Sequence, residues 1–238
     1  MSGHSKWSQI KHKKAKEDSK RGKAFTKLIK EISICARAGG GDPAGNARLR
    51  LLIDKAKELN MPQENTIRAI KRGTGELPGV SYEQFLYEGY GPYGIAVVID
   101  VLSDNKNKAA SEIRHLFNTR GGNLGESGSV SWMFEKMGVV RSPDTKLGED
   151  ELLEKLLDYD IKDIEQTDDG VAIYCDVKSL DAVKKAVEAA GLKVENAEIE
   201  WVAKNTISLP DEQAEKAYEF LNALEEQEDI QNVFTNLE

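Results

Sequence analysis

The sequence predicts an α+β fold with three domains: an N-terminal three-helix domain and two α/β two-layer sandwich domains. Two observations carry this prediction. In residues 23–73 apolar residues recur at helical spacing, and from about residue 80 short β-rich runs alternate with helical runs. The length of 238 residues suits two or three domains. No apolar run approaches the roughly 18 residues of a membrane span, and the two cysteines lie far apart, so a reducing cytoplasm is expected.

Residues 1–22 show no apolar period and are dominated by Ser, Gly, His and Lys, so they are predicted to form a mobile basic arm. A basic three-helix domain is predicted for residues 23–75. Its first two helices are marked by apolar residues at helical spacing: Phe25, Leu28, Ile29, Ile32 and Ala36, then Leu49, Leu52, Ile53, Ala56 and Leu59. The run "AGGGDP" separates these helices, and Ile67 and Ile70 mark a third helix between Pro62 and Gly73.

After the linker "GTGELPG" the pattern changes to alternating strands and helices. The predicted order is two strands, "YEQFLYEGY" and "GIAVVIDVL", a helix, "KNKAASEIRHLF", and a strand pair, "GSVSWMFEKMGVVRS". A second unit holds the helix "EDELLEKLLDYD", a hairpin of "IKDIEQ" and "VAIYCDV", the helix "LDAVKKAVEAA" and the strand "KVENAEIEWV". The chain ends with a strand, "NTISLP", a helix, "DEQAEKAYEFLNALEE", and a strand, "DIQNVFTNL".

The distribution of helices predicts a discontinuous domain. Residues 143–202 supply two helices and three strands, whereas residues 80–142 supply strands and a single helix. The helix and strand of residues 203–238 would complete the earlier unit. We therefore expect residues 80–142 and 203–238 to form one α+β domain, into which residues 143–202 are inserted as another.

Charge is distributed unevenly along the chain. Residues 1–72 hold 18 Lys and Arg against 7 Asp and Glu, a net charge of +11, while the remaining residues hold 15 against 34, a net charge of −19. This asymmetry indicates a polyanionic partner for the basic part, since the acidic part repels phosphate. The alternative is an inert, solvated basic face. Trp7 inside the lysine run weakens that alternative, because an aromatic ring can stack on a base.

The candidate nucleic-acid-binding residues lie in the arm and on the three helices. They are Lys6, Trp7, Lys11, His12, Lys13, Lys14, Lys16, Lys20, Arg21, Lys23, Lys27, Lys30, Arg48, Arg50, Arg68, Lys71 and Arg72.

Motifs for enzyme, metal and cofactor chemistry do not emerge from the sequence. "GYGPYG" matches the dinucleotide fingerprint, but a β-rich run follows it in place of a helix, so a strand connection is predicted. "RGGNLGESGS" is predicted to be a helix-to-strand loop, with a contact surface as the alternative. The histidines His4, His12 and His115 lack metal-ligand spacing, and Cys35 and Cys175 suit apolar core positions. No catalytic site, metal or cofactor is expected.

Several stretches of the chain together resemble the YebC/PmpR family over essentially its whole length. They are "MSGHSKW", "GKAFTKLIKEI", "GGGDPAGNARLRLLIDKAKELNMPQENTIRAIKRGTG", "YEGYGPYGIAVVI" and "GGNLGESGSVSWMF". The resemblance implies a helical domain and two α+β domains around a cleft. Members of this family have been described as DNA-binding transcriptional regulators. Others, including a mitochondrial translational activator, have been described as ribosome-associated factors that ease stalled peptide-bond formation.

Two functional hypotheses follow from the residues and the resemblance. In one, "AKELNMPQENTIRAIKRG" acts as a helix-turn-helix on promoter DNA and directs Gln63, Asn65, Arg68 and Lys71 toward bases. In the other, which we favour, the basic head, that is the arm and the three-helix domain together, binds ribosomal RNA and tRNA, and the protein is a translation factor. Lysine suits backbone contact, since it meets phosphate as a point charge. A third class, an enzyme, has no site to support it. A monomer with no membrane partner is expected.

Overall fold

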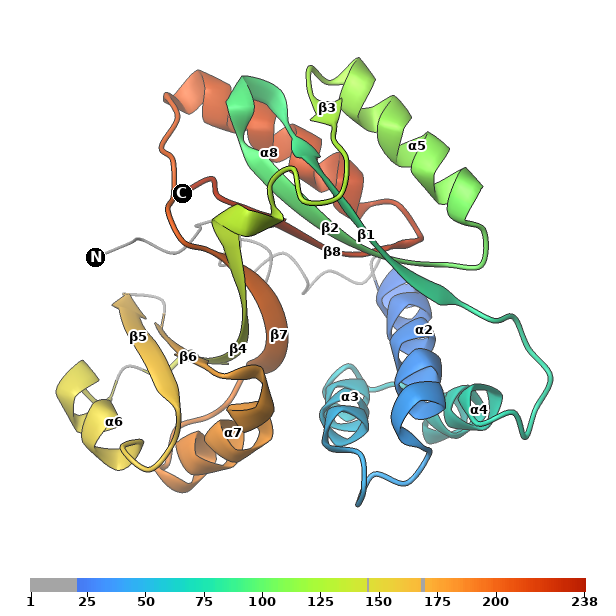
Figure 1. Ribbon diagram of the computed structural model, residues 1–238. Coiled ribbons are helices and arrows are strands. Elements are labelled where there is room, and N and C mark those ends of the chain that lie inside the picture. The colour runs from blue at the N-terminus through green and yellow to red at the C-terminus, as the bar shows by residue number, and fades with distance from the viewer. Residues whose placement is uncertain (1–20, 145, 168–169) are drawn as a thin grey trace. The chain divides into compact units, whose positions relative to one another are not determined.

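The computed structural model describes residues 21–144, 146–167 and 170–238. Its first part is a three-helix domain (Figure 1) made of α2 (Arg21–Gly39), α3 (Ala47–Glu58) and α4 (Gln63–Gly73). The three helices predicted for this domain are confirmed. Their shared core contains Leu28, Ile32, Cys35, Leu49, Leu52, Ala56, Met61 and Ala69.

Two local features fix how these helices meet. Asn46 caps α3: its side chain accepts a hydrogen bond from the Leu49 amide at 3.0 Å and donates to the Gly40 carbonyl at 2.9 Å. Gly73 lets α4 approach α2 closely, because a Cβ at this position would lie 2.2 Å from the Ser33 carbonyl oxygen. The two isoleucines that marked α4 lie differently: Ile67 is 44% exposed, whereas Ile70 packs against the core, and the buried residues of α4 are Thr66 and Ala69.

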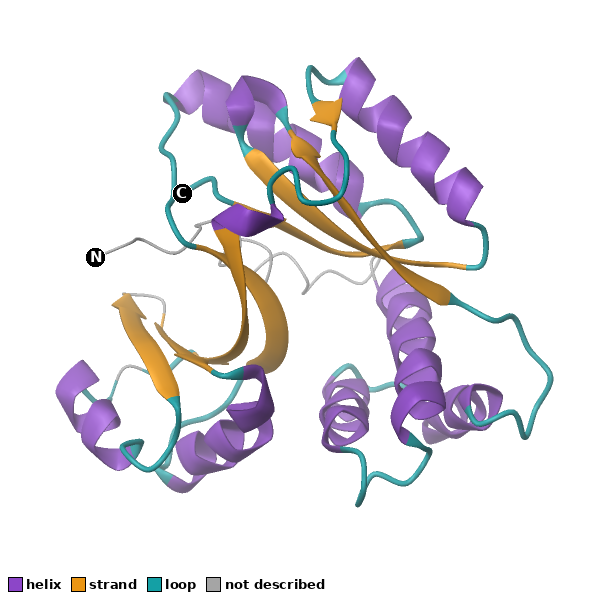
Figure 2. Cartoon of the chain, viewed as in Figure 1, coloured by secondary structure: helices purple, strands orange, loops and turns teal. Residues whose placement is uncertain are grey.

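The next part is a sheet in the order β3-β1-β2-β8, covered on one face by two helices (Figure 2). Its strands are β1 (Glu83–Tyr90), β2 (Ala96–Ser103), β3 (Asn123–Leu124) and β8 (Ile230–Thr235), and its helices are α5 (Lys106–Thr119) and α8 (Asp211–Glu225). All neighbouring strands are antiparallel. Strand β8, from the end of the chain, pairs directly with β2, so the C-terminal segment returns to this sheet.

The core beneath this sheet joins segments far apart in sequence. Phe117 of α5 and Phe220 of α8 pack edge-to-face with ring centroids 5.0 Å apart, and both are fully buried. Val97, Ile99 and Val101 alternate along β2 and enter the same core. The short 3₁₀ turn Pro92–Gly94 joins β1 to β2, which confirms that "GYGPYG" is a strand connection.

The remaining sheet has the order β5-β6-β4-β7. Its elements are β4 (Phe134–Ser142), α6 (Glu149–Lys155), β5 (Ile161–Thr167), β6 (Gly170–Cys175), α7 (Leu180–Ala189) and β7 (Asn196–Ala203). The predicted β5–β6 hairpin is confirmed. The predicted strand pair in "GSVSWMFEKMGVVRS" is wrong: this segment forms the 3₁₀ turn Ser131–Met133 and the single strand β4. Strand β4 pairs with β6, so it belongs to this sheet and not to the earlier one.

By their contacts the described residues divide into two compact units. One contains the described residues up to Glu135 together with Val202–Glu238, and the other is Lys136–Trp201. The three-helix domain and the β3-β1-β2-β8 sheet therefore share one unit. None of the described helices is both long and apolar enough to cross a membrane.

Candidate nucleic-acid interface

Half of the predicted site cannot be placed. Lys6, Trp7, Lys11, His12, Lys13, Lys14, Lys16 and Lys20 lie outside the described residues, and so does the side chain of Arg21, whose backbone begins α2. Their roles stay predictions.

Three predicted nucleic-acid-binding lysines of α2 instead contact the C-terminal end of α8 and the turn that follows it. The Lys23 Nζ atom donates to the Glu226 carbonyl at 3.4 Å, and the Lys27 Nζ atom donates to the Glu225 carbonyl at 2.9 Å. The last carbonyls of a helix lack partners within the helix and carry its negative dipole end, so ammonium groups stabilise them. Lys27 is half-buried, while Lys23 remains exposed. These lysines attach the three-helix domain to the neighbouring sheet domain.

Lys30 has the most buried ammonium group of the three. Its Nζ atom donates to the Asp229 carboxylate at 2.7 Å and to the Glu228 carbonyl at 3.2 Å. The Lys30 side chain is only 5% exposed and that of Asp229 only 17%. The prediction that Lys30 contacts nucleic acid is therefore corrected. Its spacing beside the apolar stripe of α2 predicted an exposed flank, but the turn between α8 and β8, with Glu228 and Asp229, covers the ammonium group.

Asp229 is held in its charged form by these neighbours. Burial raises the pKa of the Asp229 carboxyl, but the hydrogen bonds from Lys30 and from the Ser103 hydroxyl outweigh it and bring the pKa below its usual value. The Ser103 hydroxyl donates to the second carboxylate oxygen at 2.7 Å. The pair is thus fully hydrogen-bonded and joins α2 to the sheet.

The exposed cations of the predicted site lie on α3 and α4. Arg48, Arg68, Lys71 and Arg72 are all exposed, and Arg48, Lys71 and Arg72 form no side-chain hydrogen bond or ion pair within the described part of the chain. Arg68 lies 3.4 Å from the Glu64 carboxylate, but both side chains are largely exposed, so this pair holds Arg68 weakly. Arg50 differs: it is half-buried, and its guanidinium donates to the Pro43 carbonyl. Arg50 therefore supports the loop before α3.

Helices α3 and α4 are joined by the four residues between Glu58 and Gln63, a length found in helix-turn-helix motifs. Asn60 in this turn adopts the left-handed backbone conformation, with φ of 56°. Helix α4 does not, however, present all four proposed base-reading residues on one face. Gln63 and Asn65 are two positions apart, so they point in different directions, and Asn65 is half-buried. The exposed face instead displays Ile67, Arg68 and Lys71.

A second feature, the glycine-rich loop between β3 and β4, is organised by one buried carboxylate. Glu88 is only 3% exposed, and its carboxylate accepts hydrogen bonds from the amides of Gly128 and Val130 at 3.0 Å and of Ser131 at 2.8 Å. Burial raises the pKa of Glu88, but these backbone donors outweigh it and lower the pKa below its usual value. A carboxylate two positions from the end of a predicted strand carries no signal of this role in the sequence.

Models of two protein families match the chain. One, described as the TACO1/YebC protein N-terminal domain, matches residues 5–76, and the other, described as the TACO1/YebC second and third domain, matches residues 82–237. The chain belongs to the TACO1/YebC family. The resemblance seen in the sequence is confirmed, as is a three-domain α+β fold.

Individual relatives in the TACO1/YebC family match over nearly their whole length. A probable transcriptional regulatory protein of Chlorobaculum tepidum is 52% identical over 239 residues, covering 100% of this chain and 95% of that protein. Another protein of the same description, from Pelodictyon phaeoclathratiforme, is 50% identical and is covered to 96%. A crystal structure of a conserved hypothetical protein from Aquifex aeolicus superposes with a TM-score of 0.88 at 46% identity, covering 98% of this chain and 97% of that one.

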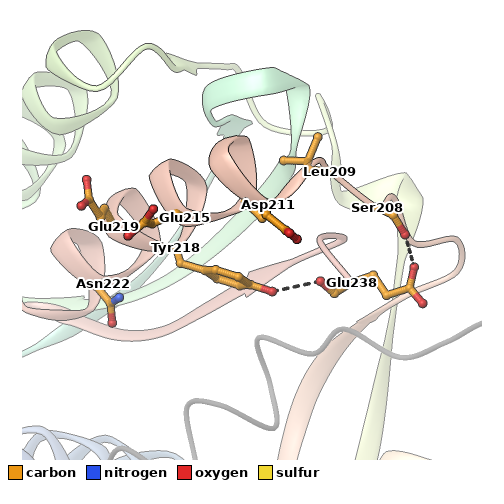
Figure 3. Close-up of a pocket in the computed structure, with 9 residues that line it drawn as sticks. Ser208, Leu209, Asp211, Glu215, Tyr218, Glu219, Asn222 and Glu238 are labelled. Atoms are coloured by element: carbon orange, nitrogen blue, oxygen red, sulfur yellow. Dashed lines mark hydrogen bonds between the residues drawn. The ribbon is translucent and has the colours of Figure 1, made fainter.

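This TACO1/YebC chain also has a surface cavity of about 670 Å³ beside α8 (Figure 3). Its lining is acidic, with Asp211, Glu215, Glu219 and the C-terminal residue Glu238. The Tyr218 hydroxyl donates to the Glu238 backbone oxygen at 3.0 Å, and burial followed by the Glu238 charge raises the pKa of that tyrosine. A cavity lined in this way repels phosphate, so it is not included in the candidate nucleic-acid interface.

The other sequence predictions can be placed in the described structure. Cys35 and Cys175 are both buried, as predicted, and burial raises the pKa of the Cys175 thiol to about 11. His115 is exposed on α5. Within the described residues no group of three or more His, Cys, Asp or Glu side chains is arranged to hold a metal ion.

Proposed function

We propose that this chain is a nucleic-acid-binding regulator of gene expression whose three-helix domain contacts the sugar–phosphate backbone. The supporting observation is the exposed set Arg48, Arg68, Lys71 and Arg72 on α3 and α4. Residues 21–73 hold 12 Lys and Arg against 5 Asp and Glu, a net charge of +7, so this set lies in a positive surrounding. The net negative charge of the remainder of the chain disfavours phosphate, so we expect the main phosphate contact at this domain and at the preceding arm.

DNA is the target that the relatives favour, because those quoted above are named probable transcriptional regulatory proteins. On this proposal α3 and α4 approach a duplex as a helix-turn-helix unit and regulate transcription. The contact is mainly to phosphates, and the lysines and arginines release condensed counterions on binding.

A second candidate, the ribosome-associated translation factor expected from the sequence, is favoured by one observation. Helix α4 does not align Gln63 and Asn65 with Arg68 and Lys71, so the side chains that read base edges in a major groove are not assembled in one row. A backbone-contacting surface of this kind also suits ribosomal RNA and tRNA. In both cases we propose a non-enzymatic protein, cytoplasmic and monomeric.

The experiment is a titration of labelled duplex DNA and of purified ribosomes with the full chain and with the double variant Lys71→Ala/Arg72→Ala. Removing two phosphate contacts reduces the slope of log affinity against log salt by about 1.8 on a duplex. A matched control is Lys57→Ala, since Lys57 is exposed but lies 3.1 Å from Asp54. The control leaves the slope unchanged. Equal slopes for all three proteins would contradict the proposed interface.

Competition separates the two targets. A sequence-reading regulator prefers one duplex over random DNA by about a thousandfold or more. If no duplex reaches that preference and ribosomes displace the DNA, the ribosomal candidate is correct. If one duplex does reach it and ribosomes do not compete, the transcriptional candidate is correct. Binding to neither would refute the proposed function.

A further inference from the structure

Trp132 is a large aromatic side chain on the surface of the first compact unit. It lies in the 3₁₀ turn Ser131–Met133, and it is 65% exposed. Its indole Nε1 atom donates to the Ser129 carbonyl at 3.2 Å. The turn is held from both sides: the Met133 amide donates to the Val130 carbonyl at 2.9 Å, and the Lys204 amide donates to the Met133 carbonyl at 2.9 Å. The ring is therefore displayed on a fixed backbone.

The side chain of Tyr90, at the end of β1, reaches the same Ser129 carbonyl as the Trp132 indole. It is 40% exposed, and its hydroxyl donates to the Ser129 carbonyl at 3.5 Å, the oxygen that also accepts from Trp132. The polar atoms of both aromatic side chains are thus engaged in hydrogen bonds within the protein. What they offer to a ligand is the ring surface, which binds by stacking and apolar contact.

The glycine-rich loop holds the Ser129 carbonyl to which Tyr90 and Trp132 bond. The buried Glu88 carboxylate fixes the amides of Gly128, Val130 and Ser131 on both sides of Ser129. Gly128 has a φ of 88°, and the space where its Cβ would lie is open. Gly125 has the opposite constraint, because a Cβ there would lie 2.5 Å from the Ser129 hydroxyl. The loop therefore packs tightly at Gly125 and leaves open space at Gly128.

A cation lies next to the backbone of Trp132. The Lys204 Nζ atom donates to the Trp132 carbonyl at 2.9 Å, and the Lys204 side chain is exposed. Surfaces that bind single-stranded nucleic acid combine exposed aromatic rings, on which bases stack, with cations that contact the backbone.

We propose that Tyr90 and Trp132 form a stacking platform for unpaired bases of a single-stranded nucleic acid, with Lys204 contacting its phosphates. The platform is separate from α3 and α4, and it deepens the proposed function, on which it rests. Duplex binding by the three-helix domain and base stacking by the platform are distinct contacts of one protein. A peptide partner is the competing occupant, and the test below separates the two.

The first measurement is the affinity for labelled oligothymidylate and oligouridylate of about 12 nucleotides, a length within the range that single-strand-binding domains cover. Trp132→Ala weakens binding by about 5- to 150-fold, the range for one base–aromatic stack. Trp132→Phe retains most of the affinity, because a ring remains. The control is Leu157→Ala, which removes another exposed apolar side chain, 69% exposed, in the other compact unit, and has no effect.

The second measurement detects stacking of a base on the Trp132 ring directly. The chain has three tryptophans, so the variant Trp7→Phe/Trp201→Phe leaves Trp132 as the only one. Its fluorescence is quenched when the oligonucleotide stacks on the ring. Binding without quenching, or an unchanged affinity of Trp132→Ala, overturns the platform while leaving the duplex or ribosome result intact. A wild-type chain that binds duplex DNA or ribosomes but not the oligonucleotides also overturns it, and a peptide partner then becomes the better occupant.

Discussion

Replacing Lys30 by methionine tests whether this lysine joins the three-helix domain to the sheet domain. The variant keeps the long aliphatic stem of Lys30 but removes the ammonium group that lies 2.7 Å from the Asp229 carboxylate. Removing one partner of a buried ion pair costs about 3–5 kcal/mol, because the other charge is left uncompensated. Asp229 is 17% exposed and keeps its bond from Ser103, which places the expected loss near the lower end, at about 3 kcal/mol.

Thermal unfolding followed by circular dichroism measures this loss. For a unit of this size about 3 kcal/mol corresponds to a fall in Tm of about 6–12 °C. The double variant Lys30→Met/Asp229→Asn recovers most of the stability, since it removes the uncompensated charge. The surface ion pair between Lys57 and Asp54, whose charged atoms lie 3.1 Å apart, provides the control. The variant Lys57→Met changes the free energy of unfolding by less than about 0.5 kcal/mol.

The pH dependence adds a second check on the same pair. The pKa of Asp229 is lower in the folded protein than in the unfolded chain, where it is about 3.9. Its stabilising contribution is therefore present above that value and is lost as the pH falls through the lowered folded pKa. The stability difference between the wild type and Lys30→Met is consequently largest at neutral pH and narrows below about pH 4. A loss under about 1 kcal/mol at pH 7, or one that does not change on acidification, would refute the role of the pair.

Three further predictions concern packing, the glycine-rich loop and chain topology. Gly73→Ala lowers the Tm by several degrees, because the added Cβ lies 2.2 Å from the Ser33 carbonyl, whereas Gly148→Ala, with open space at that position, leaves the Tm unchanged. Glu88→Gln accelerates hydrogen exchange at the Gly128, Val130 and Ser131 amides, and unchanged exchange would show that the carboxylate does not hold the loop. Because the pKa of Glu88 is lowered on folding, wild-type loop protection is also present above about pH 4.3 and decreases as the pH falls further. Deleting residues 203–238 removes α8 and β8 and abolishes exchange protection in β1, β2 and α5 while helices α3 and α4 stay protected; retained protection in β2 would contradict a discontinuous domain.

The sequence by itself determined the local elements of this protein. Helical spacing in "FTKLIKEI" and β-rich runs such as "GIAVVIDVL" predict structure from neighbours within a few positions, and α2 and β2 lie where those patterns indicate. Charge counts are equally local, so the basic head was visible without coordinates.

Tertiary structure decided which partner each residue meets. Lys30 and Lys71 have the same chemistry and both lie on predicted helices, yet one is buried against Asp229 and the other is exposed. Strand β4 has an ordinary strand pattern, but its pairing with β6 follows from contacts that its own sequence does not encode. The glycine-rich loop is the strongest case, since a buried carboxylate about 40 residues away holds the amides that position Trp132. Such pairings depend on the burial and desolvation of groups brought together only by the folded chain, and a one-dimensional pattern carries no measure of either.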